Sequence, residues 1–448
     1  MLYRKQKTAI MDWIKKGKEA LLITGARQIG KTYLIRSCLE ESGVNFIELN
    51  FIAQPELVPL FEQSTNAKDL LLRLSAVCEK PIRKGKTIFF FDELQEFKDI
   101  MTRIKFLVDE GSYRYILSGS LLGVELHNLR SAPVGYVKIL DMYPLDFEEF
   151  VIALRVQSST IDVLKESFTE RTPVDDVIHK KMLDIFYLYL IVGGMPEAVV
   201  QYIETNNLQI VKDVQLNIIS LYQLDFSKYE TKYSLYLKEI YQSMASELNQ
   251  QNKRFTLNKI KKGMSYDRMK NNFLWLKDAG VALPVYNIEQ PKHPLKLNVQ
   301  RNLFKLFYSD VGLLTCQYPD QVKLKILNKD KEINNGALFE NVVAQELSAH
   351  HVELYYYNSK KYGELDFVVE MNGDIVPLEI KSGKDYKRHS AIKAVLNNSD
   401  FDIHQAFILY NGNVEVKGNK VYYPIYMLMF LQNEQLAEPV YKLDITGL

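Results

Sequence analysis

The sequence predicts a protein of several α/β domains whose N-terminal part contains a parallel β-sheet. Three observations support this prediction. The chain has 448 residues, which is more than one core usually holds. Apolar runs of strand length alternate with helical segments between residues 19 and 150. A glycine-rich loop joins the first of these runs to a helix.

The composition is that of a folded protein and excludes several classes. It is 47% hydrophobic and 25% charged, which excludes a disordered or collagen-like chain. The net charge of +1 does not indicate any class of partner, so only local clusters of charged residues can indicate one. No apolar run approaches the roughly 20 residues of a membrane helix, and the first residues lack a signal-peptide pattern. We expect a cytoplasmic protein without a membrane partner, whose three cysteines (Cys38, Cys78, Cys316) are reduced.

The N-terminal elements follow from short apolar runs bounded by turn residues. Helical segments at 31–41 and 67–79 separate these runs. Buried strands that alternate with helices pair in parallel. Strands are predicted at 20–24, 46–49, 87–91, 115–117 and 137–140.

The loop after the first strand carries the phosphate-binding pattern G-x-x-x-x-G-K-[ST]. Its residues are Gly25, Ala26, Arg27, Gln28, Ile29, Gly30, Lys31 and Thr32. The two glycines let backbone N–H groups turn toward phosphate oxygens, and the positive end of the following helix adds to that field. Lys31 would reach the β- and γ-phosphates and the Thr32 hydroxyl would bind Mg²⁺. A glycine turn that matches by chance is the alternative, but the flanking strand and helix favour a site for ATP and Mg²⁺.

The strand at 87–91 ends in paired acids that would complete this site. Asp92 would hold Mg²⁺ at the carboxyl end of its strand, and Glu93 would orient and deprotonate the attacking water. Solvated acids at a strand end are the alternative. The next strand ends at Ser118, which could bond the γ-phosphate or the lytic water, or simply cap a helix. Arg130 could act in trans as an arginine finger, or its side chain could simply be solvated.

Four segments, in this order and spacing, resemble one family. They are residues 25–32, 91–95, 117–120 and 140–147, and residues 189–197 resemble its lid segment. The chain is similar to the AAA-type (AAA+ superfamily) ATPases of bacteria and archaea that carry a C-terminal domain of unknown function. The resemblance implies an ATPase core with a helical lid. The chain departs from the family at Ala26, where proline is common, and at residues 132–136, where many members carry a Gly-Arg pair.

Residues 253–305 form the most charged block, with 12 Lys or Arg against 3 acids, which gives +9. Two helices, at 255–260 and 266–279, precede an extended stretch with Pro291 and Pro294. This outline predicts a winged helix-turn-helix, which could bind DNA phosphates through Lys259, Arg268 and Lys270. A protein-binding module with a solvated basic face is the alternative.

The C-terminal region returns to mixed α/β patterning. It has a helix near 337–348 and strands near 353–357, 365–369, 376–380 and 406–410. Asp366, followed by Glu379 and Lys381 after a hairpin at residues 372–373, resembles the metal-dependent nuclease fold of restriction enzymes. Asp366 and Glu379 could hold Mg²⁺, Lys381 could lower the pKa of water, and Glu340 could support them. Solvated acids on a surface hairpin are the alternative.

These patterns predict an α/β protein in four parts. We expect a P-loop ATPase core at 1–155, a helical lid at 156–235, a winged-helix-like domain at 236–320 and a nuclease-like α/β domain at 325–448. The function predicted is ATP binding and Mg²⁺-dependent hydrolysis in a DNA-associated protein, with oligomer formation possible. The alternative is an ATP-switched adaptor or signalling protein whose nuclease-like domain is inactive and binds protein partners.

Overall fold

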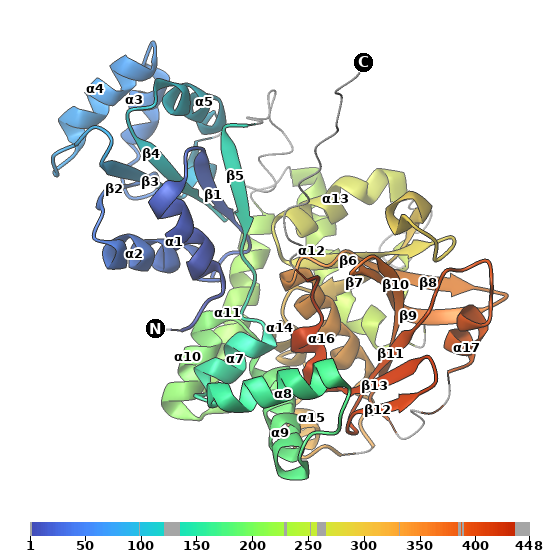
Figure 1. Ribbon diagram of the computed structural model, residues 1–448. Helices are drawn as coiled ribbons and strands as arrows, with labels where there is room; N and C mark the ends of the chain where they lie inside the picture. Colours follow the sequence, from blue (N-terminus) through green and yellow to red (C-terminus); the bar gives the residue numbers. More distant parts are fainter. Residues whose placement is uncertain are drawn as a thin grey trace, which may run out of the picture.

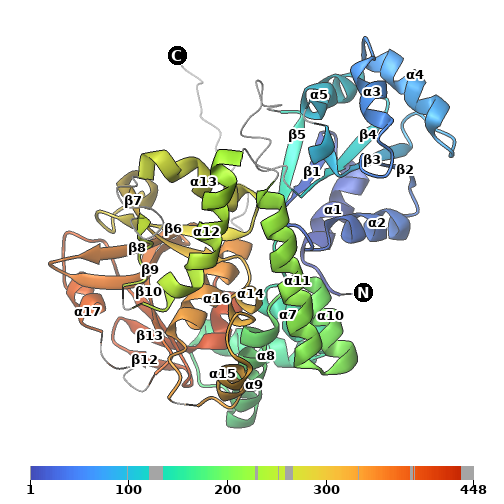
Figure 2. The ribbon, with the colours of Figure 1, turned by 180° about the vertical axis from the view of Figure 1, so that it is seen from behind.

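The computed structural model describes residues 2–97, 99–120, 135–227, 231–250, 252–257, 266–330, 332–383, 387 and 389–434. Figure 1 shows a small sheet with its helices, a central group of helices and a larger sheet beside it. Figure 2 shows the same parts from behind, with α11 running between the two sheets. Predictions for Arg130, Lys259 and residues 132–134 lie outside the described residues.

The N-terminal sheet has five parallel strands in the order β2-β3-β4-β1-β5. Alternate side chains of each strand face opposite layers. One layer holds α1 and α2, and the other holds α3, α4 and α5. The bounds are β1 Ala20–Thr24, β2 Asn45–Asn50, β3 Thr87–Asp92, β4 Arg114–Ser118, β5 Val137–Asp141, α1 Gln6–Lys16, α2 Lys31–Ser42, α3 Leu57–Glu62, α4 Ala67–Val77, η1 Leu94–Glu96 and α5 Ile100–Glu110. The prediction of a parallel P-loop-type sheet is confirmed.

The strand order explains why distant segments meet. β4 lies between β1 and β3, so the carboxyl ends of these three strands share one edge. The loop after Thr24, the carboxylate of Asp92 and the hydroxyl of Ser118 therefore gather at this edge.

Helices dominate the next part of the chain, as the sequence predicts. The first of them, α7, begins with a capping box in which Asp146 and Glu149 satisfy each other's backbone N–H groups. The bounds are α7 Phe147–Ala153, α8 Ser158–Glu170, α9 Asp176–Val192, α10 Pro196–Thr205, α11 Leu208–Phe226 and α12 Thr231–Leu248.

The C-terminal sheet is mixed and has eight strands in the order β12-β13-β11-β10-β9-β8-β6-β7. Its strands are β6 Ala282–Ile288, β7 Val299–Tyr308, β8 Leu354–Ser359, β9 Gly363–Met371, β10 Asp374–Lys381, β11 Ala406–Tyr410, β12 Glu415–Lys417 and β13 Lys420–Pro424. The other elements are α13 Tyr266–Asp278, η3 Leu295–Asn298, α14 Val311–Thr315, α15 Asp320–Leu327, α16 Gly336–Ala349, α17 Ser390–Leu396 and η4 Ile425–Phe430.

The stretch around Pro291 and Pro294 lies in a hairpin whose strands join the C-terminal sheet. The sequence predicts an extended stretch there, and in the structure residues 289–298 connect the two antiparallel strands β6 and β7. β6 also pairs in parallel with β8, so the hairpin belongs to the C-terminal sheet. The sheet thus runs across the boundary expected between residues 320 and 325. Apolar side chains on β6 and β7 pack into the large core that they share with α16.

Helix α16 is the central element of the C-terminal part. All eleven residues from Ala337 to Leu347 are buried. The helix contacts β6, β7, β8 and β10 on the sheet and α14 and η4 elsewhere. Polar residues on this helix therefore need partners within the protein.

Two further findings concern the chain as a whole. Cys38, Cys78 and Cys316 are free thiols, as predicted. Within the described ranges, every helix is too short or too polar to cross a bilayer.

Candidate functional site

The loop between β1 and α2 adopts a conformation that its glycines make possible. Gly25 has a φ of +136° and Gly30 a φ of +85°. A Cβ atom on Gly25 would collide with the backbone carbonyl of Met142. The loop therefore needs glycine at this position for two reasons, backbone conformation and the lack of space. Helix α2 begins at Lys31, directly after the loop, and its N–H groups add a positive field there.

Lys31 lies within this loop and is almost fully buried. Its Nζ donates to the carbonyls of Gly25 and Ala26, at 2.9 and 2.8 Å. Burial lowers the pKa of Lys31 to about 8, although the charges of Glu93 and Asp92 oppose the shift. The ammonium is thus held among backbone groups of the loop, where phosphate oxygens could replace the carbonyls as partners.

Asp92, at the end of β3, is hydrogen-bonded to side chains from α2, β2 and β4. The hydroxyl of Thr32 lies 3.2 and 3.1 Å from the two oxygens of Asp92, and Asn50 Nδ2 donates to one of them at 3.2 Å. Ser118 Oγ donates to the other oxygen. Burial, and then the charge of Glu93, raises the pKa of Asp92. A hydroxyl beside a carboxylate is an oxygen donor set that suits Mg²⁺.

Glu93 stands directly after the strand in a left-handed conformation, with a φ of +58°. A non-glycine residue in this region is uncommon and deserves a functional explanation. Gln95 Nε2 donates to Glu93 Oε2 at 2.5 Å and so restrains the carboxylate. The structure places Glu93 next to Asp92 and within electrostatic reach of Lys31.

Helix α11 contacts the loop, which sequence reasoning missed. Arg27 Nη1 pairs with Asp225 at 2.9 Å, and Tyr222 donates its hydroxyl proton to the carbonyl of Arg27 at 3.1 Å. Asp225 and Tyr222 lie almost 200 residues beyond the loop. No local motif marks them, because their role depends on how α11 packs. They couple the loop to the helical part of the chain.

A second polar cluster lies under the C-terminal sheet. Glu340 on α16 pairs with Lys253, and Lys305 Nζ lies 3.5 Å from Glu340 and 2.8 Å from Glu364. Asp366 Oδ2 accepts from the N–H of Ile380 at 2.8 Å, and Lys381 pairs with Glu379 at 2.7 Å. The structure thus gathers the four residues that the sequence singles out, Glu340, Asp366, Glu379 and Lys381, together with two unexpected lysines.

The electrostatics of this cluster differ from residue to residue. Burial, and then the charges of Glu340 and Glu379, raises the pKa of Asp366 to about 8. Burial also raises the pKa of Glu379, against the charge of Lys381. For Glu340 the effect of burial is outweighed by Lys305 and Lys253, so its pKa is lowered. Two lysines therefore neutralise the acid that would support a metal ion.

The ligand atoms of the three acids are not gathered tightly. In the part of the chain that the structure describes, Glu340, Asp366 and Glu379 do not form a group whose oxygens all lie within 4.8 Å of one another. A metal held by all three would require side chains to move. Two carboxylates, Asp366 and Glu379, remain as the donor set that this cluster offers.

The basic block divides into inward and outward residues. Lys305 is 1% exposed and Lys253 is 20% exposed, and both pair with Glu340. Arg268 and Lys270 on α13 are exposed. Lys270, Lys277 and Arg301 line a groove of about 1300 Å³ that also reaches Gly25 and Ala26 of the loop. Only part of the +9 charge is therefore presented to solvent.

Comparisons with known proteins divide the chain into three matched parts. A model described as an AAA domain matches residues 17–151. Two models of domains of unknown function, DUF8612 and DUF4143, match residues 183–325 and 335–428. No curated protein matches the chain.

Several solved structures resemble the chain at low identity. They include the Walker-type ATPase PABY2304 of Pyrococcus abyssi, at 15% identity over 70% of this chain and 95% of that chain, with a TM-score of 0.41. The Thermotoga maritima RuvB Holliday junction branch migration motor matches at 14% identity, over 68% and 92% of the two chains, with a TM-score of 0.31. The Aeropyrum pernix ORC1 protein in complex with DNA matches at 14%, over 74% and 93%, with a TM-score of 0.25.

Proposed function

Because residues 17–151 form an AAA-type P-loop domain, we propose that this chain binds ATP with Mg²⁺ and hydrolyses it at the edge of the N-terminal sheet. One observation carries the proposal. The hydroxyl of Thr32 contacts the carboxylate of Asp92, directly beside the loop that contains Lys31. This arrangement combines oxygen ligands for a hard cation with N–H groups and an ammonium for phosphates.

The loop would bind the phosphates. The N–H groups of residues 25–32 and the start of α2 supply donors, and Lys31 supplies a full charge once phosphate oxygens replace its carbonyl partners. Thr32 and Asp92 would hold Mg²⁺, which neutralises phosphate charge when it is bound. Ser118 and Asn50 orient Asp92 through their hydrogen bonds and are positioning residues.

Glu93 would act on the attacking water. It follows Asp92 at the same edge of the sheet, and Gln95 limits its motion. A carboxylate held near the γ-phosphate can accept a proton from water as the new P–O bond forms. As that bond forms, the bond between the γ-phosphorus and the β–γ bridging oxygen would break, and ADP would be the leaving group, still held by the loop.

Glu93→Gln tests this assignment. The variant should bind ATP as the wild type does but hydrolyse it roughly 10² times more slowly or worse, because the amide cannot accept the proton. Isothermal calorimetry measures binding and phosphate release measures turnover. Glu96→Gln, at an exposed position on η1, is the matched control and should leave turnover unchanged. Turnover of Glu93→Gln at the wild-type rate would remove Glu93 from the mechanism.

Lys31→Ala separates binding from folding in the same experiment. Its Nζ bonds only to backbone carbonyls of the loop among the contacts described, so the substitution should leave the sheet folded. ATP binding should be lost, since the phosphates then lack their main positive charge. Tight ATP binding by a folded Lys31→Ala variant would contradict the proposed site.

The C-terminal cluster favours a second candidate function over nuclease activity. Lys253 and Lys305 neutralise Glu340, the acid expected to support a metal ion held by Asp366 and Glu379. As this second candidate we therefore propose an ATP-switched adaptor or signalling protein in the cytoplasm, whose nuclease-like domain does not cut and binds protein partners. Incubation of plasmid DNA with the full chain and Mg²⁺ or Mn²⁺ should leave it intact. Cleavage that disappears in Asp366→Asn would restore the nuclease assignment.

A further inference from the structure

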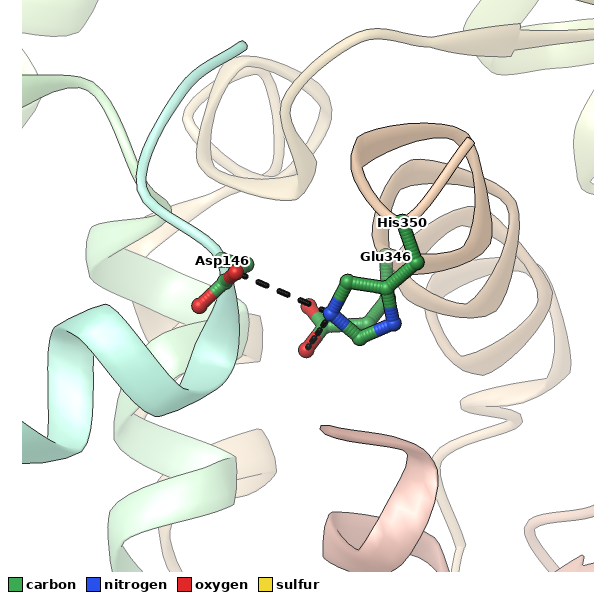
Figure 3. A group of neighbouring side chains, drawn as sticks. All are labelled: Asp146, Glu346 and His350. Carbon is green, nitrogen blue, oxygen red and sulfur yellow. Dashed lines mark ion pairs between the residues drawn. The ribbon is translucent and has the colours of Figure 1, made fainter. Parts of the chain in front are cut away.

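A third polar cluster joins the ATPase core to the C-terminal sheet. Asp146 caps α7 just after β5, whereas Glu346 lies in the last turn of α16 and His350, four residues later, is the C-cap of that helix. One ligand atom from each of the three residues lies within 4.8 Å of the other two. Figure 3 shows the imidazole and the two carboxylates turned toward one another from these two elements.

The imidazole of His350 is oriented by its other nitrogen. Nδ1 lies 2.9 Å from the backbone carbonyl of Leu431, which can only accept, so Nδ1 carries the proton. Among the described residues, Nε2 has no partner at hydrogen-bond distance, and the side chain is 3% exposed. The atoms that Nε2 faces are Asp146 Oδ2 at 3.7 Å and Glu346 Oε1 at 3.8 Å. When Nε2 is unprotonated, its lone pair and two carboxylate oxygens face one buried space, where they repel one another unless a metal ion or a proton lies between them.

The cations already present do not balance the acids around this space. Lys5 pairs with Asp146 at 2.7 Å and with Glu148 at 2.6 Å, and Arg4 pairs with Glu149 at 3.3 Å. With Glu346 there are four carboxylates against two cations. With all four carboxylates ionised and His350 neutral, this group of described residues lacks two positive charges, which is the charge of one divalent ion. Protons on Glu346 and His350 are the alternative to that ion, because burial raises the pKa of Glu346 and, against the effect of burial, the neighbouring carboxylates raise the pKa of His350.

Each carboxylate keeps capacity for a further ligand bond. Asp146 uses Oδ1 to accept from the N–H of Glu149 and shares Oδ2 with Lys5. Glu346 accepts the N–H of Phe147, at 2.9 Å on Oε2 and 3.2 Å on Oε1. Ionised carboxylates offer about four lone-pair directions, so neither residue is saturated.

We propose that Asp146 Oδ2, Glu346 Oε1 and His350 Nε2 bind a divalent transition-metal ion of the Zn²⁺ class. Imidazole nitrogen is a ligand that Zn²⁺ accepts readily, whereas Mg²⁺ and Ca²⁺ prefer oxygen alone. The carbonyl oxygen of Leu431 accepts the proton of His350 Nδ1, which is the kind of hydrogen bond that orients a metal-binding histidine. Three protein ligands leave a coordination position for water.

The position of this site defines its role. Met142 and Leu145, in the segment that leads to Asp146, bond to Thr24 beside the phosphate loop and to Gly194. The ion would tie this segment to α16, the central helix of the C-terminal part. We infer a structural ion that holds the two parts together, because all three side chains are buried and offer no access for a substrate.

The test uses the full chain, freed of metal by a chelator and without nucleotide. Zn²⁺ uptake is measured by calorimetry and metal analysis, and Co²⁺ is added separately because its absorption reports coordination by nitrogen and oxygen. Wild type should take up one tight equivalent, with a higher Tm when Zn²⁺ is present. Glu346→Gln and His350→Gln should bind at least about 100-fold more weakly, more than the loss of an outer partner causes.

Two matched controls exclude other sites. His404→Gln removes an exposed histidine that lies 3.1 Å from Asp402, and Asp366→Asn removes an acid of the C-terminal cluster. Both should keep the tight equivalent. Glu346→Gln retains an oxygen that can accept from Phe147, so it keeps the test valid if His350→Gln fails to fold. A folded wild type that binds no Zn²⁺, or variants that bind it as wild type does, would overturn the proposal and leave a proton on Nε2 instead.

Discussion

At the residue scale, Asp310 shows how a buried carboxylate can connect two parts of the chain. Its oxygens accept from the N–H of Gly194 at 2.6 Å and of Leu313 at 3.1 Å. The first bond reaches the turn between α9 and α10, and the second caps α14. Burial raises the pKa of Asp310 to about 6, although these hydrogen bonds oppose the shift.

This raised pKa has a definite consequence for stability. A folded state that holds a carboxyl proton more tightly than the unfolded state loses free energy of unfolding as the pH rises from about 4 to about 6. The asparagine of Asp310→Asn is neutral at every pH. The difference in free energy of unfolding between wild type and this variant should therefore decrease over that pH range, by no more than about 3 kcal/mol. Urea unfolding at pH 4.5 and 7 measures the change. The exposed Asp374→Asn should show no such trend, and a constant difference for Asp310→Asn would contradict the argument.

At the element scale, the turn at Gly193 and Gly194 is packed from both sides. Gly193 has a φ of +68°, and a Cβ on it would collide with Asp310. A Cβ on Gly194 would collide with the backbone of Leu145, whose N–H donates to the Gly194 carbonyl at 2.7 Å. Residues 189–197, which resemble a family lid, therefore form a junction in which the backbone at Gly194 packs directly against the backbone at Leu145.

Gly194→Ala should strain this junction. Backbone cannot move aside as a flexible side chain can, so the substitution should cost about 1–3 kcal/mol of unfolding free energy. Calorimetry of the full chain should show a lower Tm. Gly383→Ala is the matched control, since a Cβ there meets no atom of the described residues within 4 Å. Equal Tm values for the two variants would show that the junction relaxes freely.

The hairpin of β9 and β10 shows how one element builds a polar cluster. Asn372 and Gly373 have φ values of +52° and +87°, the conformation expected of a tight two-residue turn. Met371 then pairs with Asp374, and this register continues to Phe367 opposite Leu378. Asp366 and Glu379 therefore reach the same end of the sheet, as predicted.

At the scale of the whole molecule, the groove beside the phosphate loop is lined by residues of both the N-terminal P-loop part and the C-terminal part of the chain. Its lining includes Gly25 and Ala26 on one side and Lys270, Lys277 and Arg301 on the other. A nucleic acid that bound there would contact exposed lysines and also lie near the nucleotide site. The groove also contains Asp141, Asp278 and Glu353, so its charge is only moderately positive.

A salt titration tests whether the exposed cations of α13, Arg268 and Lys270, bind DNA. If the full chain binds DNA, replacing Arg268 and Lys270 by Ala should lower the slope of log affinity against log salt by roughly one for each lost phosphate contact. Lys15 and Lys16, exposed at the end of α1, form a matched control pair whose replacement should leave the slope unchanged. An unchanged slope for the α13 variant would place DNA elsewhere. DNA-stimulated ATP hydrolysis would favour the DNA-associated form of the proposed function over protein binding alone.

The sequence by itself determined what neighbouring residues encode. The eight loop residues are contiguous, the strands of the first sheet are apolar runs between turn residues, and Asp92 ends one of them. Since parallel strands end at a common edge, the meeting of Asp92 with the loop follows from pattern alone. The hairpin at Asn372 and Gly373 is encoded in the same local way.

Only the tertiary structure decided which distant side chains pair. Lys253 and Glu340 are 87 residues apart, Arg27 and Asp225 are 198 apart, and Phe147 and Glu346 are 199 apart. Periodicity states which face of a helix is buried but not which charged group lies opposite it. A lysine in a basic block therefore looks solvated in the sequence, whereas in the fold Lys305 neutralises Glu340. The cost of burying an unpaired charge, and not any local pattern, requires these partners to meet.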